Sequence, residues 1–242
     1  RGIWSRQKWL HVQGAKKWGE YSRPEMVELQ ARFFDHFLLG RGSGLGDGPP
    51  VRAELRERYG VGTFVESTAW PLPEVEYRTL HLDASSGTLS HDAVAAESSA
   101  TYHGLGDPFA ASRVVFEHRF DHPADVIGHA RATLYVEAPE ASDMDVFVGL
   151  FKRDAAGGIV PFAYYAQYED GPVALGWIRA SHRELDAERS TDYLPVLAHR
   201  RELPLEPDGP TRLDLEILPS RTRSSLLPGP FPGSGPRRAL CP

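Results

Sequence analysis

The chain of 242 residues is 41% hydrophobic and 25% charged, an ordinary globular composition with enough apolar material for a core. Its net charge of −6 argues against a nucleic-acid partner, because phosphate binding needs a basic surface. No apolar run approaches the roughly 18–20 residues of a membrane span. Cys241, the single cysteine, leaves no internal disulfide and no cysteine-based metal site. We therefore expect no nucleic acid, membrane, cofactor or metal as a partner.

Residues 1–40 have the pattern of one strand followed by one helix. No apolar leader precedes them, which favours a cytoplasmic location, and the missing first Met suggests a longer parent protein. Lys8–Val12 is a short strand candidate, and Pro24 begins a helix that has Ser22 as its expected cap and Gly40 at its end. This order is typical of α/β domains, so residues 1–40 are interpreted as the C-terminal end of such a domain.

Residues 41–50 are rich in Gly and Pro and are predicted to be a linker. From 51 to 220, short extended segments alternate with turns, which predicts a mainly β, two-sheet sandwich or jelly roll. The predicted strands are Val51–Leu55, Tyr77–Leu82, Arg113–Phe120, Gly128–Glu137, Val146–Phe151, Leu175–Ala180, His199–Leu203 and Arg212–Leu218.

Core residues of the sandwich are suggested by alternation and by residue type. Strict alternation places Leu213, Leu215 and Ile217 on one face of the last predicted strand, and this face is expected in the core. Trp70 and Trp177 are more often core residues than an aromatic ligand surface, and we expect them in the core.

Residues 221–242 abandon the strand pattern, since proline recurs at 228, 230, 232 and 236. We expect this tail to be disordered. The chain is rich in Arg and poor in Lys, which suggests a gene of high GC content, and such a gene read out of frame yields Arg/Pro/Gly/Ser sequence of this kind. Whether the tail after Ser220 is native or the product of a frameshift is left open.

A search for catalytic motifs finds no nucleophile elbow, Gly-x-Ser-x-Gly. Ser43 lies between two glycines but in the predicted linker, where no strand-to-helix turn is expected. The histidines at 118, 122 and 129 are predicted on extended chain, where four residues span about 13 Å, too far to share an ion. The aspartates at 121, 125, 143 and 145 lack the spacing of a calcium loop and are expected to be turn carboxylates.

Five segments in order resemble the cocaine-esterase/nonD (CocE/NonD) hydrolases and the related X-Pro dipeptidyl-peptidases. Gly176–Asp186 is similar to the family's G-W-L-R-x-S-H-R-x-L-D segment. The other similar segments are Phe33–Leu38 (F-F-D-H-F-L), Trp70–Pro73 (W-P), Ile127–His129 (T-G-H) and Asp143–Val148 (D-x-D-x-F-V). The resemblance runs from about residue 8 to residue 218.

The resemblance implies an α/β-hydrolase domain with a Ser-His-Asp triad, followed by a C-terminal jelly roll of the galactose-binding-like type. The nucleophile and the acid would lie upstream of this chain, so no catalytic residue is assigned within it. The family's histidine falls at Lys17, which marks either a subfamily with another base or lost activity. His11 is the nearest alternative, but the periodicity places it within a strand.

The function expected from this resemblance is hydrolysis of an ester or of an X-Pro dipeptide by the full-length protein, with the sandwich packing on the catalytic domain. The chain alone is expected to be inactive. The alternatives are a free-standing jelly-roll module that binds carbohydrate or peptide, and an inactive pseudo-hydrolase. The sequence indicates neither the choice between ester and dipeptide nor the oligomeric state.

Overall fold

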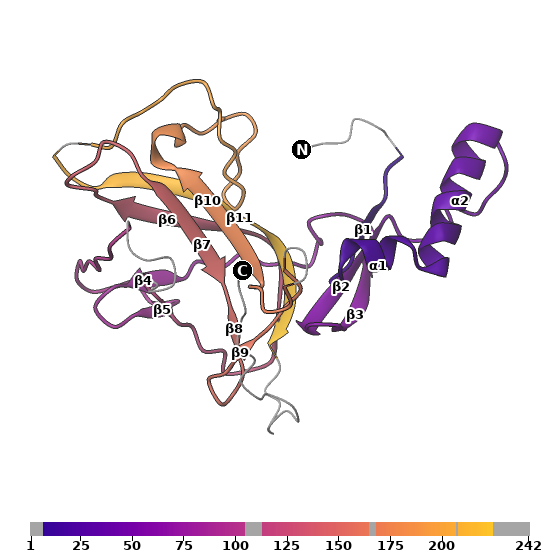
Figure 1. Cartoon of the computed structure of the whole chain (residues 1–242), viewed down its shortest axis with the longest axis horizontal. Coiled ribbons are helices and arrows are strands. Elements are labelled where there is room, and N and C mark those ends of the chain that lie inside the picture. The colour runs from indigo at the N-terminus through magenta and orange to yellow at the C-terminus, as the bar shows by residue number, and fades with distance from the viewer. Residues whose placement is uncertain (1–6, 105–112, 165–167, 207, 225–242) are drawn as a thin grey trace. The chain divides into compact units, whose positions relative to one another are not determined.

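The computed structural model describes residues 7–104, 113–164, 168–206 and 208–224. The chain divides into two compact units, one formed by Arg1–Pro73 with Pro123–Pro242 and the other by Glu74–His122. The mainly β class predicted from the sequence is confirmed (Figure 1). In the described part of the chain, no helix is both long and apolar enough to cross a membrane.

The N-terminal segment forms β1 (Leu10–Val12), α1 (Lys17–Tyr21) and α2 (Pro24–Leu39). The predicted helix is confirmed: Pro24 occupies its first turn, and Gly40 ends it with a φ of 61° while its N–H bonds to the carbonyl of Asp35. The predicted cap is wrong, because Ser22 instead ends α1 and the N-cap of α2 is Arg23, which makes no side-chain cap bond.

The strand β1 pairs in parallel with β2 (Val51–Arg58), which forms an antiparallel hairpin with β3 (Val61–Ser67). Leu10 lies opposite Val51, and Val12 opposite Ala53. This pairing joins residues on both sides of the segment 41–50 in one sheet. The first strand therefore has its hydrogen-bonding partner within the described chain.

Four further strands join β2 in the sandwich: β6 (Ala124–Val136), β7 (Asp145–Leu150), β10 (Ala174–Arg179) and β11 (Thr211–Ser224). The sheet order is β1-β2-β11-β10-β7, with β3 also on β2 and β6 also on β11. The two-residue strands β8 (Lys152–Arg153) and β9 (Ile159–Val160) form a small hairpin, and the 3-10 turn η1 (Ala180–His182) follows β10.

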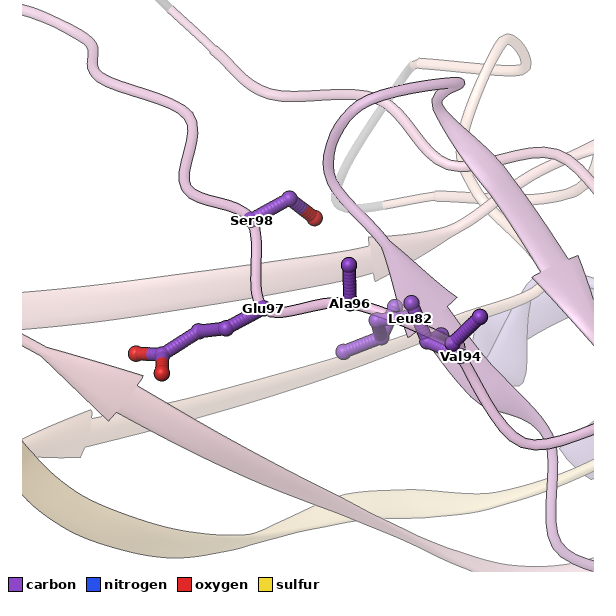
Figure 2. Close-up of a pocket in the computed structure, with 6 residues that line it drawn as sticks. Leu82, Val94, Ala96, Glu97 and Ser98 are labelled. Atoms are coloured by element: carbon purple, nitrogen blue, oxygen red, sulfur yellow. The ribbon is translucent and has the colours of Figure 1, made fainter.

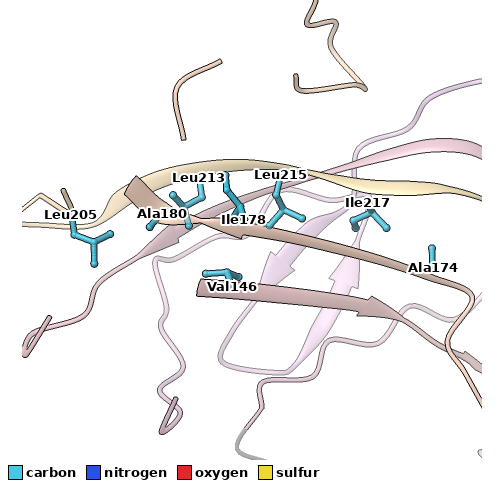
Figure 3. Packing of buried hydrophobic residues seen from close by; sticks show 8 residues of the cluster. All are labelled: Val146, Ala174, Ile178, Ala180, Leu205, Leu213, Leu215 and Ile217. Carbon is cyan, nitrogen blue, oxygen red and sulfur yellow. The ribbon is translucent and has the colours of Figure 1, made fainter. Parts of the chain in front are cut away.

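The core lies between β11 and the pair β7/β10, as Figure 3 shows. Leu213, Leu215 and Ile217 are buried on one face of β11, as their alternation predicts. Val146 and Ile178 meet them from β7 and β10. The close crossing of β10 over β11 depends on glycine, because a Cβ at Gly176 would lie 2.3 Å from the carbonyl oxygen of Glu216.

The last strand is longer than predicted, since β11 does not end at Leu218 but continues to Ser224. A shift in register between Ile217 and Ser220 accommodates Pro219, after which pairing with β6 resumes. Thr222 also pairs with Arg56 of β2. The predicted change of structure after Ser220 thus falls inside a strand, and the rest of the predicted tail, 225–242, lies outside the described residues.

The unit Glu74–His122 contains the hairpin of β4 (His81–Asp83) and β5 (Thr88–Ser90). Two predictions are too long here: only the end of Tyr77–Leu82 is strand, and Arg113–Phe120 has a single bridge, from Glu117 to Thr88. His199–Leu203 also forms no strand, and His199 has a φ of 52°. These segments have the residue types of strands but lack a ladder partner.

Candidate functional site

The loop after β1 is fixed by a glycine and a carboxylate. The N–H of Gly14 donates to Oε2 of Glu54 over 2.6 Å. A Cβ at Gly14 would lie 2.4 Å from Cδ of Arg56, so this close approach requires glycine. The sandwich strand β2 therefore holds the loop that leads to Lys17.

Two lysines are adjacent at the end of this loop, and Lys16 is the one that contacts the sandwich. Its ammonium donates to the carbonyl of Tyr164 over 2.7 Å and to the carbonyl of Tyr168, and it stands 6.0 Å from the ring centre of Trp18. Lys17 is the first residue of α1 and is exposed. No sequence pattern indicates this role of Lys16, because the carbonyls it contacts are more than 140 residues away.

His11 lies within β1, as the periodicity predicts, opposite Arg52 of β2. Its ring centre is 5.6 Å from that of Phe64. Burial, followed by the positive charge of Arg52, lowers the pKa of His11 below its ordinary value of 6.5. A neutral imidazole at pH 7 has the protonation state of a general base, but its neighbours are arginine and an aromatic ring.

Two arginines meet where β2 and β11 pair. The guanidinium of Arg56 donates to the carbonyl of Val173 and to the hydroxyl of Ser220, at 3.0 and 2.7 Å, and lies 4.8 Å from the ring centre of Phe162. Arg221 is 5% exposed. Burial, then the charge of Arg56, lowers the pKa of Arg221 to about 10.

A polar cavity of about 250 Å³ lies at the start of β7 and the end of β10, lined by Ser142, Asp143, Arg179, Ser181, His182, Glu202 and Pro204. Asp143 accepts from the N–H and hydroxyl of Ser181 at 2.8 and 2.7 Å. Burial raises the pKa of Asp143, but the hydrogen bonds from Ser181 and Met144 and the charge of Arg179 together outweigh it and leave that pKa lowered. The aspartate thus acts as a structural acceptor that joins two motif segments.

A second cavity, of about 280 Å³, lies within the unit Glu74–His122 (Figure 2). Leu82 and Val94 form its apolar side, and Glu97 and Ser98 lie on the neighbouring loop. Its lining has one titratable residue, Glu97, and no histidine, and the hydroxyl of Ser98 donates to Oδ1 of Asp83 at 3.4 Å. Its side chains do not form a catalytic arrangement.

The remaining predicted sites are also structural. Ser43 follows α2 rather than opening a strand-to-helix turn, and its carbonyl accepts from Arg32. Asp125 pairs with Arg223, and Asp145 with Arg179. Within the described ranges, no group of three or more His, Cys, Asp or Glu side chains is placed to hold a metal ion.

The histidines and tryptophans differ in their surroundings. His118 bonds through Nδ1 to the carbonyl of Leu89 at 2.9 Å. His129 lies 3.9 Å from Oε1 of Glu216, and its ring is 6.2 Å from that of half-buried Trp70. The prediction that Trp177 is a core residue is wrong, because its exposed fraction is 57%.

The chain matches one protein family and is similar to solved structures of hydrolases. Residues 43–226 match the family described as the X-Pro dipeptidyl-peptidase C-terminal non-catalytic domain. Two crystal structures of a CocE/NonD family hydrolase from Staphylococcus aureus are similar to this chain, each with 36% identity and a TM-score of 0.85. The alignments cover 90% of this chain and 39% of that chain.

An aminopeptidase from a marine sediment archaeon of the Thaumarchaeota has the same fold, with 18% identity, a TM-score of 0.54, and coverage of 90% of this chain and 36% of that one. No curated protein matches. The chain therefore spans well under half the length of the solved proteins that it resembles.

Proposed function

The chain belongs to the family of X-Pro dipeptidyl-peptidase C-terminal non-catalytic domains, and from this premise we propose that it is the C-terminal part of a serine acyl-hydrolase. In this proposal the catalytic α/β domain precedes the chain, and the sandwich packs on it and supports it. β1 and α2 complete the catalytic domain. The coverage of 39% of the Staphylococcus aureus hydrolase supports a longer protein with room for that domain.

The observation that carries the proposal is the apolar surface of α2. None of its 16 residues is buried. Phe33, Phe34 and Phe37 are 42%, 54% and 43% exposed, and Leu38 is 73% exposed. Full burial of such side chains contributes roughly 1.5–3 kcal/mol each, so the helix is suited to packing against further structure. A free-standing binding module offers no reason for this helix.

The substrate class proposed is an ester or an X-Pro dipeptide, cleaved by a serine of the preceding domain. That serine would attack the carbonyl and a base would take its proton. The family's histidine position is Lys17, whose exposed side chain lies beside the loop fixed by Gly14 and Glu54. Lys17 also favours the second candidate, a pseudo-hydrolase that has the architecture but no activity.

The test is fluorophosphonate labelling of two proteins: residues 1–242 alone, and the product of the complete reading frame. We expect no labelled serine in the chain alone, and a labelled serine upstream of it in the longer protein. Labelling of a serine within 1–242 that heat denaturation abolishes contradicts the proposal. A complete frame that encodes an α/β domain without labelling supports the pseudo-hydrolase.

A further inference from the structure

The outer face of the strand pair β7/β10 carries large aromatic side chains. Trp177 lies directly opposite Phe147, and Arg179 opposite Asp145. Phe147 is 76% exposed and Trp177 is 57% exposed. Phe151, 57% exposed, extends the same face, since its ring carbon Cε2 lies 2.7 Å from where a Cβ of Gly149 would be. We call these residues, Asp145, Phe147, Phe151, Trp177 and Arg179, the aromatic face.

The outward direction of these side chains is set by the packing on the other side of the strands. Gly176 crosses β11 too closely to carry a side chain, and Ile178 is buried in the core. Because side chains alternate along a strand, Trp177 and Arg179 must point away from that core. The aromatic face is therefore built into the sheet by its inner contacts.

The ion pair at one end of the aromatic face is bidentate. Nε and Nη2 of Arg179 donate to the two carboxylate oxygens of Asp145, both at 2.9 Å. The polar cavity lined by Asp143, His182 and Glu202 adjoins Arg179. An apolar centre beside a polar margin is the composition of a protein–protein interface.

The aromatic face coincides with the segments in which the chain resembles its family. Phe147 belongs to Asp143–Val148, and Trp177 and Arg179 belong to Gly176–Asp186. β7 and β10 bring these two segments side by side, and their large side chains point outward rather than into the core. A feature that does not serve the core of the sandwich is suited to contact with another part of the same protein.

We propose that the aromatic face is the docking surface of the preceding α/β domain. This inference rests on the proposed function. The occupant is chosen because 61% of the Staphylococcus aureus hydrolase, the remainder after the 39% that is covered, lies outside the region matched by this chain. The contacting surface of that domain is apolar at its centre, where it meets Trp177 and Phe147, and polar where it meets the ion pair of Arg179.

The test measures how fast a cysteine on the aromatic face reacts with N-ethylmaleimide. The variant is Phe147→Cys in a Cys241→Ser background, prepared both as residues 1–242 and as the complete reading frame. The modified peptide is quantified by mass spectrometry, so that other cysteines do not interfere. We expect reaction in the longer protein to be slower by about tenfold or more, because a docked surface reacts only when it opens.

The matched control is Tyr135→Cys on β6, where the native side chain is 65% exposed. It is expected to react at the same rate in both proteins. Fluorophosphonate labelling of the longer protein is established first, so that a failure of the proposed function is recognised separately. Equal rates for Phe147→Cys in the two proteins, when the catalytic serine is labelled, overturn the docking surface.

Two further outcomes assign the aromatic face to another occupant. Protection of Phe147→Cys in residues 1–242 that increases with protein concentration indicates a second copy of the chain. Protection of residues 1–242 by added cellohexaose indicates a carbohydrate platform, in which sugar rings stack on Trp177. Either result overturns the proposal.

Discussion

Arg221 is a buried, positively charged residue that lies beside a second arginine, Arg56. Its side chain neighbours Arg56, and both pKa values are lowered, first by burial. In the described part of the chain, Nε of Arg221 has no hydrogen-bond partner. The negative charge of Glu54 opposes the lowering of both pKa values but does not outweigh burial. A buried charge that is only partly compensated costs stability, and hydrophobic replacements of buried ions are often stabilising.

We predict that Arg221→Leu raises the free energy of unfolding by about 1–3 kcal/mol. Urea denaturation of residues 1–242 measures the change. The control is Arg223→Leu, since Arg223 makes a partly exposed ion pair with Asp125, and such pairs contribute little to stability. A lower stability for Arg221→Leu contradicts this account of the cluster.

Asp214 is the opposite case, a well-partnered charge on the outer side of β11. It accepts from the hydroxyl of Thr133 at 2.7 Å and from Nε of Arg131 at 3.0 Å. Burial raises the pKa of Asp214, but the hydrogen bonds from Thr133, Arg131 and Arg212 outweigh it and hold the pKa below the ordinary 3.8. Its stabilisation is thus complete above pH 3.8 and is lost as the pH falls through the lowered pKa.

We predict that Asp214→Asn lowers the free energy of unfolding at pH 7 by about 2–3 kcal/mol, because Arg131 loses its charged acceptor. The difference in stability between this variant and the native chain should shrink below pH 3.8. There Asp214 of the unfolded native chain binds a proton before the folded chain does, which favours unfolding of the native chain. Denaturation curves at pH 7 and pH 3 test this. An equal difference at both pH values would show that shape rather than charge is responsible.

Residue patterns predicted some buried positions and missed others for a physical reason. Alternation was sufficient for Leu213 and Leu215, because their strand has large apolar residues on one face only. It failed for Trp177, because on β10 the larger side chains lie on the outer face, and the inner face carries Gly176 to permit the crossing of β11. Residue size does not show which face of a strand is buried.

Among the elements, β11 extends further than its sequence pattern. The apolar alternation ends at Leu218, but pairing with β6 continues to Ser224 opposite Ala124. Polar residues such as Thr222 occupy buried positions there, and its hydroxyl donates to the carbonyl of Arg56. Backbone pairing, which sequence patterns do not report, thus sets the length of the strand.

We predict that removal of residues 225–242 leaves the free energy of unfolding unchanged, whereas removal of 219–242 lowers it. The second truncation deletes the ladder from Ser220 to Ser224 and the contact of Thr222 with β2. Urea denaturation of chains 1–224 and 1–218 provides the measurement. Equal stability of these two chains would show that the extension of β11 contributes nothing.

The helix α2 has the reverse property, a regular pattern without a buried face. Phe33 and Phe37 contact each other at 4.8 Å between ring centres, and Trp9 lies 6.4 Å from Phe37. The rest of the stripe is exposed on the side where an α/β domain would place its sheet. Exposed apolar stripes of this kind promote association.

We predict that Phe34→Ser combined with Leu38→Ser makes residues 1–242 more soluble and more monomeric in light scattering, because these side chains are 54% and 73% exposed. The matched control is Thr63→Ser, an exposed substitution on β3 that should change neither property. An unchanged molecular mass and solubility would show that α2 is not the associating surface.

At the scale of the whole molecule, the sequence predicted the fold class and the types of element better than the pairing between strands. The mainly β class and the N-terminal strand and helix are confirmed, but the parallel pairing of β1 with β2 was not predicted. Such a pairing depends on hydrogen bonds between backbones about 40 residues apart, which leave no pattern in the side chains. The unit Glu74–His122 was likewise not separated, since its residues resemble those of the sandwich strands.

The contacts that build the candidate site could not be predicted from the sequence either. The family resemblance indicates Lys17 as the histidine position, but contacts across the fold show that Lys16, Gly14 and Glu54 fix this loop. These contacts join positions far apart in the sequence. Spacing alone could not reveal them.

The most direct test of the account is amide hydrogen exchange of α2 in residues 1–242 and in the product of the complete reading frame. We predict fast exchange along Pro24–Leu39 in the chain alone, because no residue of this helix is buried there. In the longer protein, exchange of the same amides should slow by about tenfold or more, as expected for a helix packed against a sheet. Equal exchange in the two proteins would contradict the assignment of this chain to the C-terminal part of an α/β-hydrolase.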